Sequence, residues 1–245
     1  YYENFSSELK SHGVSTETIQ RDKNESISCF KSRLECDLDE KFTSKFDIIE
    51  IPQSYGLLNS IECSCPVHVR LHGSDSLLSE LSSRRKKYYN EEKLCLKRGD
   101  FISAPSMLSL KMESIVFKQK ISGYVFPNMN LESINQVKFE NSYNINNVGI
   151  ASKVSGLKGL SFMLKVIKSC QNINFYIFDK NLVSYFLIGK FKNVVLCKNT
   201  NVLSKIYRDY IDCFIVPSVY ESYSMIASEA LKFNKKVIVW NSCGI

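Results

Sequence analysis

Glycine and proline are scarce in this sequence: its 245 residues include ten of the first and five of the second. This scarcity excludes a collagen-like chain and a linker-rich one, because both need many more of these residues. The sequence also lacks an apolar run of about 18 residues, the length that a membrane-spanning helix requires. What remains is an ordinary globular composition, 44% hydrophobic and 23% charged, which suits one large domain or two smaller ones.

The sequence lacks the usual patterns of metal ligands as well. Its nine cysteines are irregularly spaced without a Cys-X-X-Cys pair, and only three histidines are present, His12, His68 and His72. Structural zinc sites typically use closely spaced cysteine and histidine pairs, so we expect no metal site. Several cysteines lie inside apolar runs such as DCFIV (212–216), where cysteine behaves as a small hydrophobic residue. We therefore expect a reduced, cytoplasmic protein.

The N-terminal stretch YYENFSSELK is polar and does not begin with methionine. A secretory signal peptide has an apolar segment near its start, so we expect none here. The missing methionine suggests a fragment or a processed chain.

The positive charge is modest but locally concentrated. The net charge of +7 suits nucleic acid, an anionic membrane or a phosphate-bearing substrate without choosing between them. Four consecutive basic residues, Arg84, Arg85, Lys86 and Lys87, precede two tyrosines in a segment that we expect to be a long helix. They form either a solvated face or a surface attracted to an anionic membrane, at roughly 1 kcal/mol per basic residue. No nucleic-acid recognition motif accompanies them, so we expect no nucleic-acid partner.

Short β-rich runs alternate with helix-like segments along nearly the whole chain. Several of the strand-like runs are continuously apolar, which is typical of strands covered on both faces in a parallel sheet. This alternation favours an α/β architecture with right-handed crossovers. The predicted strands are 46–51, 66–71, 101–105, 123–126, 147–151, 173–178, 193–197, 212–216 and 236–240. The predicted helices are 76–98, 106–118, 158–170, 201–210 and 224–233.

The regular alternation breaks once. After GYVFPNMN (123–130) the chain becomes rich in asparagine and weakly patterned, and it becomes regular again at NVGIA (147–151). Such a stretch is typical of a connecting segment. We therefore predict two domains, residues 1–127 and 146–245, joined by a linker at residues 128–145.

The stretch PSVYESYSMIASEAL (217–231) places two glutamates eight positions apart, between an apolar strand and the next helix. Open α/β sheets bind ligands at the carboxyl ends of their strands. The helix that begins near Ser224 directs its first N–H groups to that edge with about half a positive charge, which suits phosphate. Glu221 lies in the preceding loop at the same edge. Glu229 lies beside the apolar stripe of the helix, as either an ordinary solvated glutamate or a ligand contact, for example to sugar hydroxyls.

This stretch, extended by Val216, resembles the E-x7-E signature of the retaining glycosyltransferases of family 4, the group 1 glycosyl transferases, which have the GT-B fold. The residues that match the signature are Pro217, Ser218, Glu221, Tyr223, Glu229 and Ala230. ASKVSGLKGLSFML (151–164) resembles the family segment that carries two cations to the donor diphosphate. There Lys158 and Gly159 match the Lys-Gly pair, and Lys153 stands where arginine is usual.

The resemblance continues through the rest of the chain, in the order of the family. RLHGSD (70–75) is similar to the family's turn with a histidine, here His72. DFISAPS (100–106) is similar to a strand and turn of the first domain, and YVFPNMN (124–130) to the segment between the domains.

The resemblance implies two Rossmann-like domains that face each other across a cleft, the first on the acceptor side and the second binding the nucleotide sugar. It implies transfer of a sugar from a nucleotide-diphosphate sugar to a glycan or lipid-linked acceptor, with retention of configuration and without a metal or cofactor. The implied donor-binding residues are Lys153, Lys158, Tyr223, Ser224, Met225 and Glu229. Glu221 and His72 are the implied catalytic residues, toward the donor sugar and the acceptor. Many relatives build lipid-linked glycans, which implies a cytoplasmic enzyme of polysaccharide or lipopolysaccharide biosynthesis, peripheral on the inner face of a membrane.

Some positions depart from the family pattern. Ser224 replaces a glycine of the signature, Asn234 and Lys236 replace a glycine and a proline, and Cys243 replaces a glycine of the closing turn. The family's opening strand and closing helices are missing, so we expect a chain that is incomplete at both ends. Two alternatives stay open: a GT-B nucleotide-sugar epimerase, and a catalytically degenerate protein that binds sugar nucleotides or acts as a scaffold. A phosphorylase would need a pyridoxal phosphate lysine, for which we find no sequence context.

Overall fold

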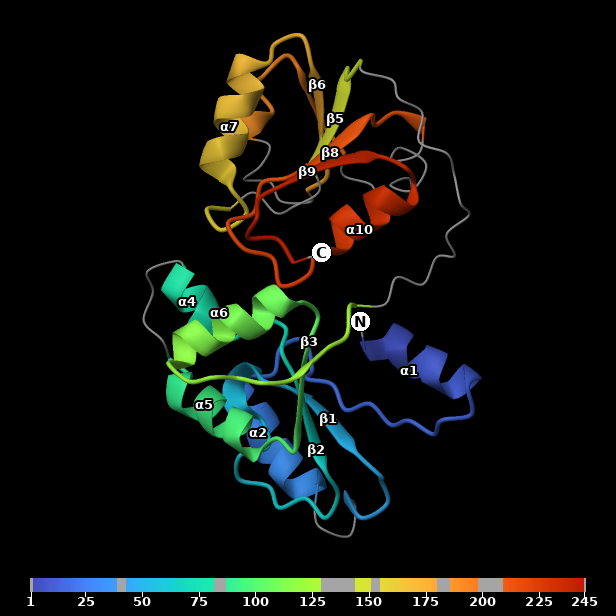
Figure 1. The fold of residues 1–245 in the computed structure, drawn as a ribbon, viewed down its shortest axis with the longest axis vertical. Helices are drawn as coiled ribbons and strands as arrows, with labels where there is room; N and C mark the ends of the chain where they lie inside the picture. The colour runs from blue at the N-terminus through green and yellow to red at the C-terminus, as the bar shows by residue number, and fades with distance from the viewer. Residues whose placement is uncertain are drawn as a thin grey trace. The chain divides into compact units, whose positions relative to one another are not determined.

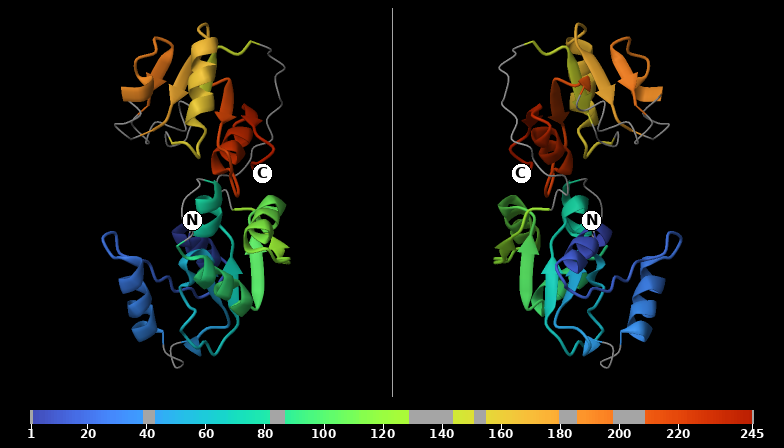
Figure 2. Two further views of the ribbon diagram at one scale, coloured as in Figure 1. Left: turned by 90° about the vertical axis from the view of Figure 1, so that its left-hand side faces the viewer. Right: turned by 90° about the vertical axis from the view of Figure 1, so that its right-hand side faces the viewer.

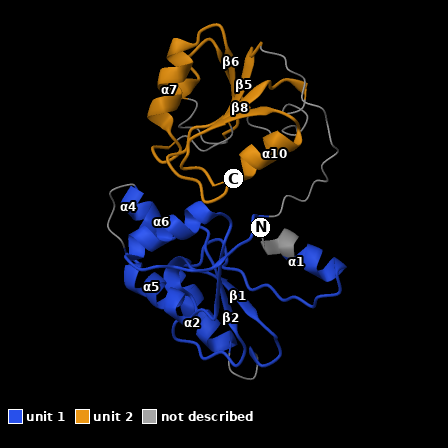
Figure 3. Cartoon of the chain, viewed as in Figure 1, with its two compact units in different colours: residues 1–131 blue, residues 132–245 orange. Residues whose placement is uncertain are grey.

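The chain forms two compact units, Tyr1–Leu131 and Glu132–Ile245, coloured blue and orange in Figure 3. Each unit contains one parallel β-sheet with helices packed on it (Figure 1). The computed structural model describes residues 2–38, 43–81, 87–128, 144–150, 155–179, 186–197 and 209–244. Of the predicted linker at 128–145, residues 129–143 lie outside these ranges.

The sheet of unit 1 has the strand order β1-β2-β3-β4, and every neighbouring pair is parallel. Its strands are β1 (Ile49–Pro52), β2 (Val67–Arg70), β3 (Phe101–Ala104) and β4 (Tyr124–Val125). Its helices are α1 (Tyr2–Ser11), α2 (Ile27–Asp37), the short 3₁₀ helix η1 (Ser54–Gly56), α4 (Asp75–Leu81), α5 (Tyr89–Arg98) and α6 (Met107–Phe117). Helix α5 packs against β2 and α6 against β3, where Val69, Ala104 and Phe117 have no exposed surface.

The sheet of unit 2 has the order β7-β6-β5-β8-β9 and is also parallel throughout. Its strands are β5 (Asn147–Ile150), β6 (Asn174–Ile177), β7 (Val194–Leu196), β8 (Cys213–Val216) and β9 (Lys236–Val239). The described residues of this unit include the helices α7 (Leu160–Ser169) and α10 (Met225–Lys232). The chain runs outward from β5 to β7 and then returns to β8 on the other side of β5, so the strand order reverses between β5 and β8.

Helices α7 and α10 cover opposite faces of this sheet (Figures 1 and 2). Phe175 and Ile177 of β6 pack in one core cluster with residues of α7. The alternate residues Tyr176 and Phe178 pack in the other cluster, with Ala230 of α10. Successive side chains of a strand point to opposite faces, so the two clusters lie on the two sides of the sheet. This double covering explains why the strands of unit 2 read as continuous apolar runs.

The nine predicted strands are all present, with bounds that differ by a few residues at most. The prediction of one long helix at 76–98 is wrong. Helix α4 ends at Leu81, Lys87 and Tyr88 form a bend, and α5 begins at Tyr89. The reason is a tertiary contact: the Glu92 carboxylate of α5 binds the first turn of α4. One straight helix would hold these groups roughly 25 Å apart. Helix α2 was not predicted, and most of the predicted helix 201–210 lies outside the described residues.

No helix among the described residues is both long enough and apolar enough to span a bilayer.

Candidate functional site

The reversal of strand order in unit 2 brings two loops side by side at the carboxyl edge of the sheet. Strands β5 and β8 are hydrogen-bonded parallel neighbours, so their carboxyl ends lie side by side at this edge. The Val219 N–H group donates to the Leu157 carbonyl at 2.9 Å, which ties the second loop to the first. Gly159 has a φ of +75°, and a Cβ atom there would lie 1.9 Å from the Pro217 carbonyl oxygen. Only glycine fits this contact, which gives a physical reason for the glycine of the Lys-Gly pair.

A third loop, which follows β9, closes the same edge. The Glu221 N–H group donates to the Ser242 carbonyl at 3.2 Å, and Gly244 donates back to the Glu221 carbonyl at 2.8 Å. The Ser224 N–H group donates to the Gly244 carbonyl at 3.0 Å. The backbone on both sides of Glu221 is thus held by the chain segment that contains Cys243. Three loops from distant parts of the sequence therefore fix the position of one carboxylate.

The side chains at this edge form a compact charged cluster, which we call the Lys158 cluster: Lys158, Glu221 and Ser218. The Lys158 Nζ atom lies 2.5 Å from Glu221 Oε1, and the Ser218 hydroxyl donates to the same oxygen at 2.6 Å. The lysine side chain is 36% exposed and the glutamate 19%, so the ion pair is partly desolvated. A cation and a carboxylate that neutralise each other at the carboxyl edge of a parallel sheet can exchange partners when a charged ligand arrives. The resemblance named Lys158 and Glu221; Ser218 was only a match to the signature.

Helix α10 begins beside this cluster. Ser224 is its N-cap residue, with 3% exposure, and its side chain accepts from the Ala227 N–H group at 3.2 Å. The serine that replaces the signature glycine therefore satisfies one of the free donors of the first turn. The Tyr223 hydroxyl donates a hydrogen bond to the Ser228 hydroxyl at 3.3 Å. Glu229 lies half-buried one turn beyond Met225 on the same helix.

Six of the predicted site residues thus lie in unit 2, on the loops of the carboxyl edge and on α10: Lys158, Glu221, Tyr223, Ser224, Met225 and Glu229. Lys153 falls outside the described residues.

His72 belongs to unit 1, in the turn between β2 and α4. Burial and the nearby charge of Arg70 lower its pKa to about 4, so the imidazole is neutral near pH 7. Arg70 itself is buried and donates to the Phe126 carbonyl at 2.6 Å and to Asn128 Oδ1 at 3.0 Å. A neutral imidazole has one ring nitrogen that donates a hydrogen bond and one that accepts, so at the carboxyl edge of a strand it suits contact with a hydroxyl group.

A second polar arrangement in unit 1 has the order of a hydrolytic triad. Glu50 Oε2 lies 2.9 Å from His68 Nδ1, and His68 Nε2 lies 2.7 Å from the Ser103 hydroxyl. Ser103 has no exposed surface, and Arg70 donates to its hydroxyl at 3.0 Å. A hydroxyl without exposed surface cannot meet a substrate, so this row links the strands and carries no reaction.

Of the predicted basic cluster only Lys87 is described; it is exposed, and its Nζ atom lies 5.0 Å from the centre of the Tyr88 ring.

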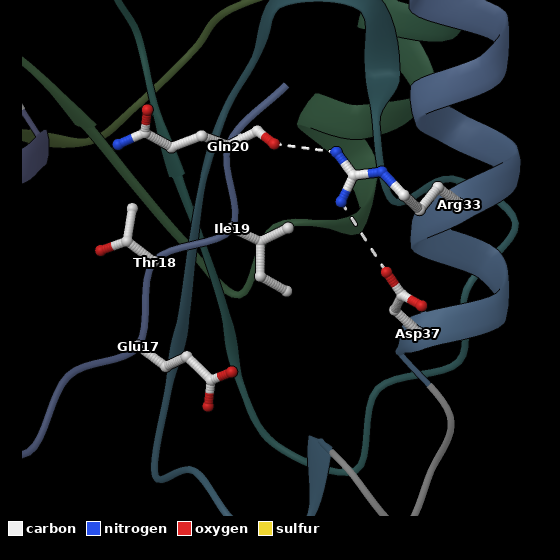
Figure 4. A pocket seen from close by; sticks show the side chains of 6 residues that line it. All are labelled: Glu17, Thr18, Ile19, Gln20, Arg33 and Asp37. Atoms are coloured by element: carbon white, nitrogen blue, oxygen red, sulfur yellow. Dashed lines mark hydrogen bonds and ion pairs between the residues drawn. The ribbon is translucent and has the colours of Figure 1, made fainter. Parts of the chain in front are cut away.

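A hollow of about 460 Å³ occurs elsewhere in unit 1 (Figure 4). It is lined by Glu17, Thr18, Ile19, Gln20, Arg33 and Asp37. Arg33 already donates to the Gln20 carbonyl at 2.8 Å and pairs with Glu25 and Asp37, so it is not poised for a ligand. In the described ranges, no three His, Cys, Asp or Glu residues are grouped so as to hold a metal ion.

The chain is similar in structure to several known proteins. Sucrose-phosphate synthase from Thermosynechococcus elongatus matches with a TM-score of 0.64 and 14% identity, over 89% of this chain and 60% of that one. A mutant of S. aureus TarM, solved in complex with Fondaparinux, alpha-GlcNAc-glycerol and UDP, matches with a TM-score of 0.63 and 15% identity, over 88% and 45%. The catalytic domain of starch synthase IV from Arabidopsis thaliana, bound to ADP and acarbose, matches with a TM-score of 0.61 and 12% identity, over 91% of this chain and 63% of that one.

These neighbours have the GT-B fold, and the match confirms the prediction that this chain has it too. No family model matches the chain, and no match was found among curated proteins. The identities, all between 12% and 15%, are low enough that the likeness establishes the fold alone. The chain spans 60%, 45% and 63% of the length of these three structures.

Proposed function

We propose that this protein is a retaining glycosyltransferase, which moves a sugar from a nucleotide-diphosphate sugar to an acceptor hydroxyl. The observation that carries the proposal is the Lys158 cluster beside the N-terminus of α10, at the point where the strand order of a GT-B unit reverses. Two of the similar structures hold a nucleoside diphosphate, UDP in one and ADP in the other.

Donor binding would exchange the partners of the Lys158 cluster. The diphosphate of the donor would take Lys158 from Glu221, because two phosphate groups present more negative charge than one carboxylate. Glu221 would then be free to accept hydrogen bonds from the sugar hydroxyls. Glu229, further along α10, would accept from the ribose hydroxyls. Lys153 would supply a second cation to the diphosphate.

The departing nucleoside diphosphate accumulates negative charge as the sugar leaves. Lys158 and the first turn of α10, from Ser224 to Met225, would meet this charge with groups already in place, which is the main way in which such a site lowers a barrier. We propose that these groups suffice without a metal ion.

The acceptor hydroxyl would attack the anomeric carbon on the face from which the phosphate leaves. The bond from carbon to phosphate oxygen breaks, the bond from carbon to acceptor oxygen forms, and the acceptor proton passes to the leaving phosphate oxygen. Neutral His72 would line the acceptor side. In this proposal residues 1–127 bind the acceptor and 146–245 the donor, with 128–145 as the linker.

We further propose a role in glycan synthesis in the cytoplasm, with the basic residues 84–87 near an anionic membrane. Ligand-detected NMR of the protein against a panel of nucleotide sugars, followed by turnover without acceptor, tests the function. Slow release of free sugar supports a transferase, a changed sugar indicates an epimerase, and binding without turnover indicates a scaffold. If no nucleotide sugar binds, the proposal is wrong.

A further inference from the structure

Unit 1 contains two buried carboxylates that the proposed mechanism does not use. Glu92 of α5 and Glu113 of α6 both have no exposed surface. A charged group in such a place is costly unless hydrogen-bond donors surround it. The donors that reach these two groups belong to the loops at the carboxyl edge of the sheet, next to His72.

Glu92 accepts hydrogen bonds on both of its oxygens. Oε1 accepts from the Asp75 N–H group at 2.8 Å and from the Tyr55 N–H group at 3.3 Å. Oε2 accepts from the Ser76 N–H group at 3.0 Å and from the Ser76 hydroxyl at 2.5 Å. Glu92 thus caps the first turn of α4 from a neighbouring helix, and it binds the loop after β1 with the same oxygen.

Glu113 holds the residue just before α4. Its Oε1 atom accepts from the Ser74 N–H group at 2.8 Å, and its Oε2 atom accepts from the Ser74 hydroxyl at 2.8 Å. The Ser74 hydroxyl oxygen in turn accepts from the Leu77 N–H group at 3.0 Å. The Gln53 side-chain amide, in the loop after β1, donates to Glu113 Oε2 over a long 3.4 Å.

The two carboxylates therefore join the loops that follow β1 and β2 into one unit. Ser54 adds a bond from its hydroxyl to the Gly73 carbonyl at 3.4 Å. Tyr55, whose N–H group Glu92 holds, has a φ of +70°, a left-handed conformation that is strained for a residue other than glycine. Gly73, the residue after His72, has a φ of +99°. A strained loop and a tight turn keep their shape only when surrounding contacts determine it, and here Glu92 and Glu113 supply these contacts.

We propose that Glu92 and Glu113 are positioning residues, which hold the turn His72–Asp75 and the loop after β1 in the shape that turnover requires. The inference rests on the proposed function, because the turn has a catalytic task only if His72 lines an acceptor site. Neither carboxylate touches the substrate in this proposal; each acts through the loops that it binds.

The two carboxylates differ in a way that an isosteric substitution can test. Glu92 accepts in all four of its hydrogen bonds, and three of the donors are backbone N–H groups that cannot rotate. A glutamine at this position would therefore direct its NH₂ group at another donor. Glu113 has adaptable neighbours. The Ser74 hydroxyl can rotate, and the side-chain carbonyl oxygen of Gln53 is buried without a hydrogen-bond partner, so it can accept from a new NH₂ group after an amide flip. Burial raises the pKa of both carboxyl groups, and that of Glu113 reaches about 7, so the Glu113 carboxyl group is readily neutral.

The experiment compares Glu92→Gln with Glu113→Gln, and uses Glu91→Gln on the same helix as the matched control. Hydrogen exchange at residues 71–77, the thermal midpoint, nucleoside diphosphate affinity and nucleotide-sugar turnover are measured for each variant, with the diphosphate and sugar that the wild type selects from a panel. Glu92→Gln should speed exchange at Asp75 and Ser76 and lower kcat roughly 10- to 100-fold, because a small misplacement of a reacting group has such an effect. Its KM for the donor and its nucleotide affinity should stay within about twofold, because the donor residues lie in unit 2. Glu91→Gln should leave kcat within about threefold. Glu113→Gln should lower kcat less than Glu92→Gln does, because Ser74 and Gln53 can readjust to the amide, and a kcat equal to that of Glu91→Gln would remove Glu113 from the proposal.

A faster exchange in Glu92→Gln with an unchanged kcat would overturn the positioning role, and so would an equal loss of kcat in Glu91→Gln. Should Glu92→Gln not fold, Ser76→Ala removes a single bond to Glu92 Oε2 and should lower kcat about 2- to 10-fold. An unchanged kcat in Ser76→Ala would then refute the inference. If the wild type neither binds nor turns over nucleotide sugars, the proposed function is wrong. The hydrogen-exchange data would still show whether Glu92 holds the turn.

Discussion

Replacing Glu221 by glutamine should tighten the binding of a plain nucleoside diphosphate, although the residue is proposed to be catalytic. Glu221 Oε1 lies 2.5 Å from Lys158 Nζ, and an incoming diphosphate has to take the lysine from it. Glutamine keeps the size of the side chain and an oxygen that can accept from Ser218. It removes only the charge that competes for Lys158.

The size of the gain follows from the exposure of the pair. An ion pair between partly exposed side chains is worth roughly 0.2–1 kcal/mol, and its loss from the free protein would appear as about 1.4- to 5-fold tighter binding. The 19% exposure of Glu221 places the expected value toward the upper end of that range, and the 36% exposure of Lys158 keeps it from exceeding the range. Added salt should reduce the gain, because it screens the exposed side of the pair.

Isothermal titration of the wild type, Glu221→Gln, Lys158→Ala and the double variant measures this coupling. If the gain arises through Lys158, it should largely vanish in the Lys158→Ala background. Turnover of the nucleotide sugar should nevertheless fall in Glu221→Gln, because the carboxylate no longer meets the sugar hydroxyls. Weaker nucleotide binding by Glu221→Gln, or an equal gain with and without Lys158, would refute the exchange of partners.

Four further outcomes are expected. Glu229→Ala should weaken nucleoside diphosphate binding about 10- to 150-fold in isothermal titration, through loss of a charge-assisted hydrogen bond, and an unchanged affinity would contradict the ribose contact. His72→Ala should lower transfer to an acceptor while nucleotide affinity stays nearly constant, and a large loss of affinity would show that the assignment is wrong. Glu113 has a pKa of about 7 in the folded protein and an ordinary value of 4.5, so its contribution to stability is complete below pH 4.5 and is lost as pH rises through 7, by up to about 3 kcal/mol. Thermal or denaturant unfolding should show this slope in the wild type and a flatter one in Glu113→Gln; equal slopes would count against it. Replacing the basic residues 84–87 by serine should weaken co-sedimentation with anionic vesicles, and equal binding of both proteins would remove the membrane proposal.

The strands could be predicted from the sequence because their cause is local. A strand of unit 2 packs helices on both faces, so its apolar run is visible without any knowledge of the fold. Helix α2 gives a weaker signal, since only Phe30 and Leu34 of its residues are buried. The break between α4 and α5 was missed for a different reason: it depends on Glu92, whose role is visible only when its partners in other loops are known.

The candidate site shows the same division. The resemblance predicted Glu221 from the signature and Lys158 from the segment 151–164, yet nothing in the sequence indicated that they pair across 63 positions. Ser218 lies within the signature, and its bond to Glu221 followed only from the folded loop. In unit 1 a buried glutamate on a helix looks like any solvated one in the sequence, so no motif distinguished Glu92 or Glu113.

Ser224 shows how a departure seen in the sequence can be interpreted once the folded structure is known. In the sequence it is a departure from the signature, which has a glycine at this position. In the folded chain its side chain caps Ala227 at 3.2 Å, which stabilises the start of α10 and occupies one of the N–H groups that a phosphate could bind. In the proposed donor complex the remaining first-turn donors and Lys158 then meet a larger share of the diphosphate charge. The release of Lys158 from Glu221 therefore matters more in this chain than it would beside a glycine, and Ser224→Gly should reduce the loss of affinity that Lys158→Ala causes.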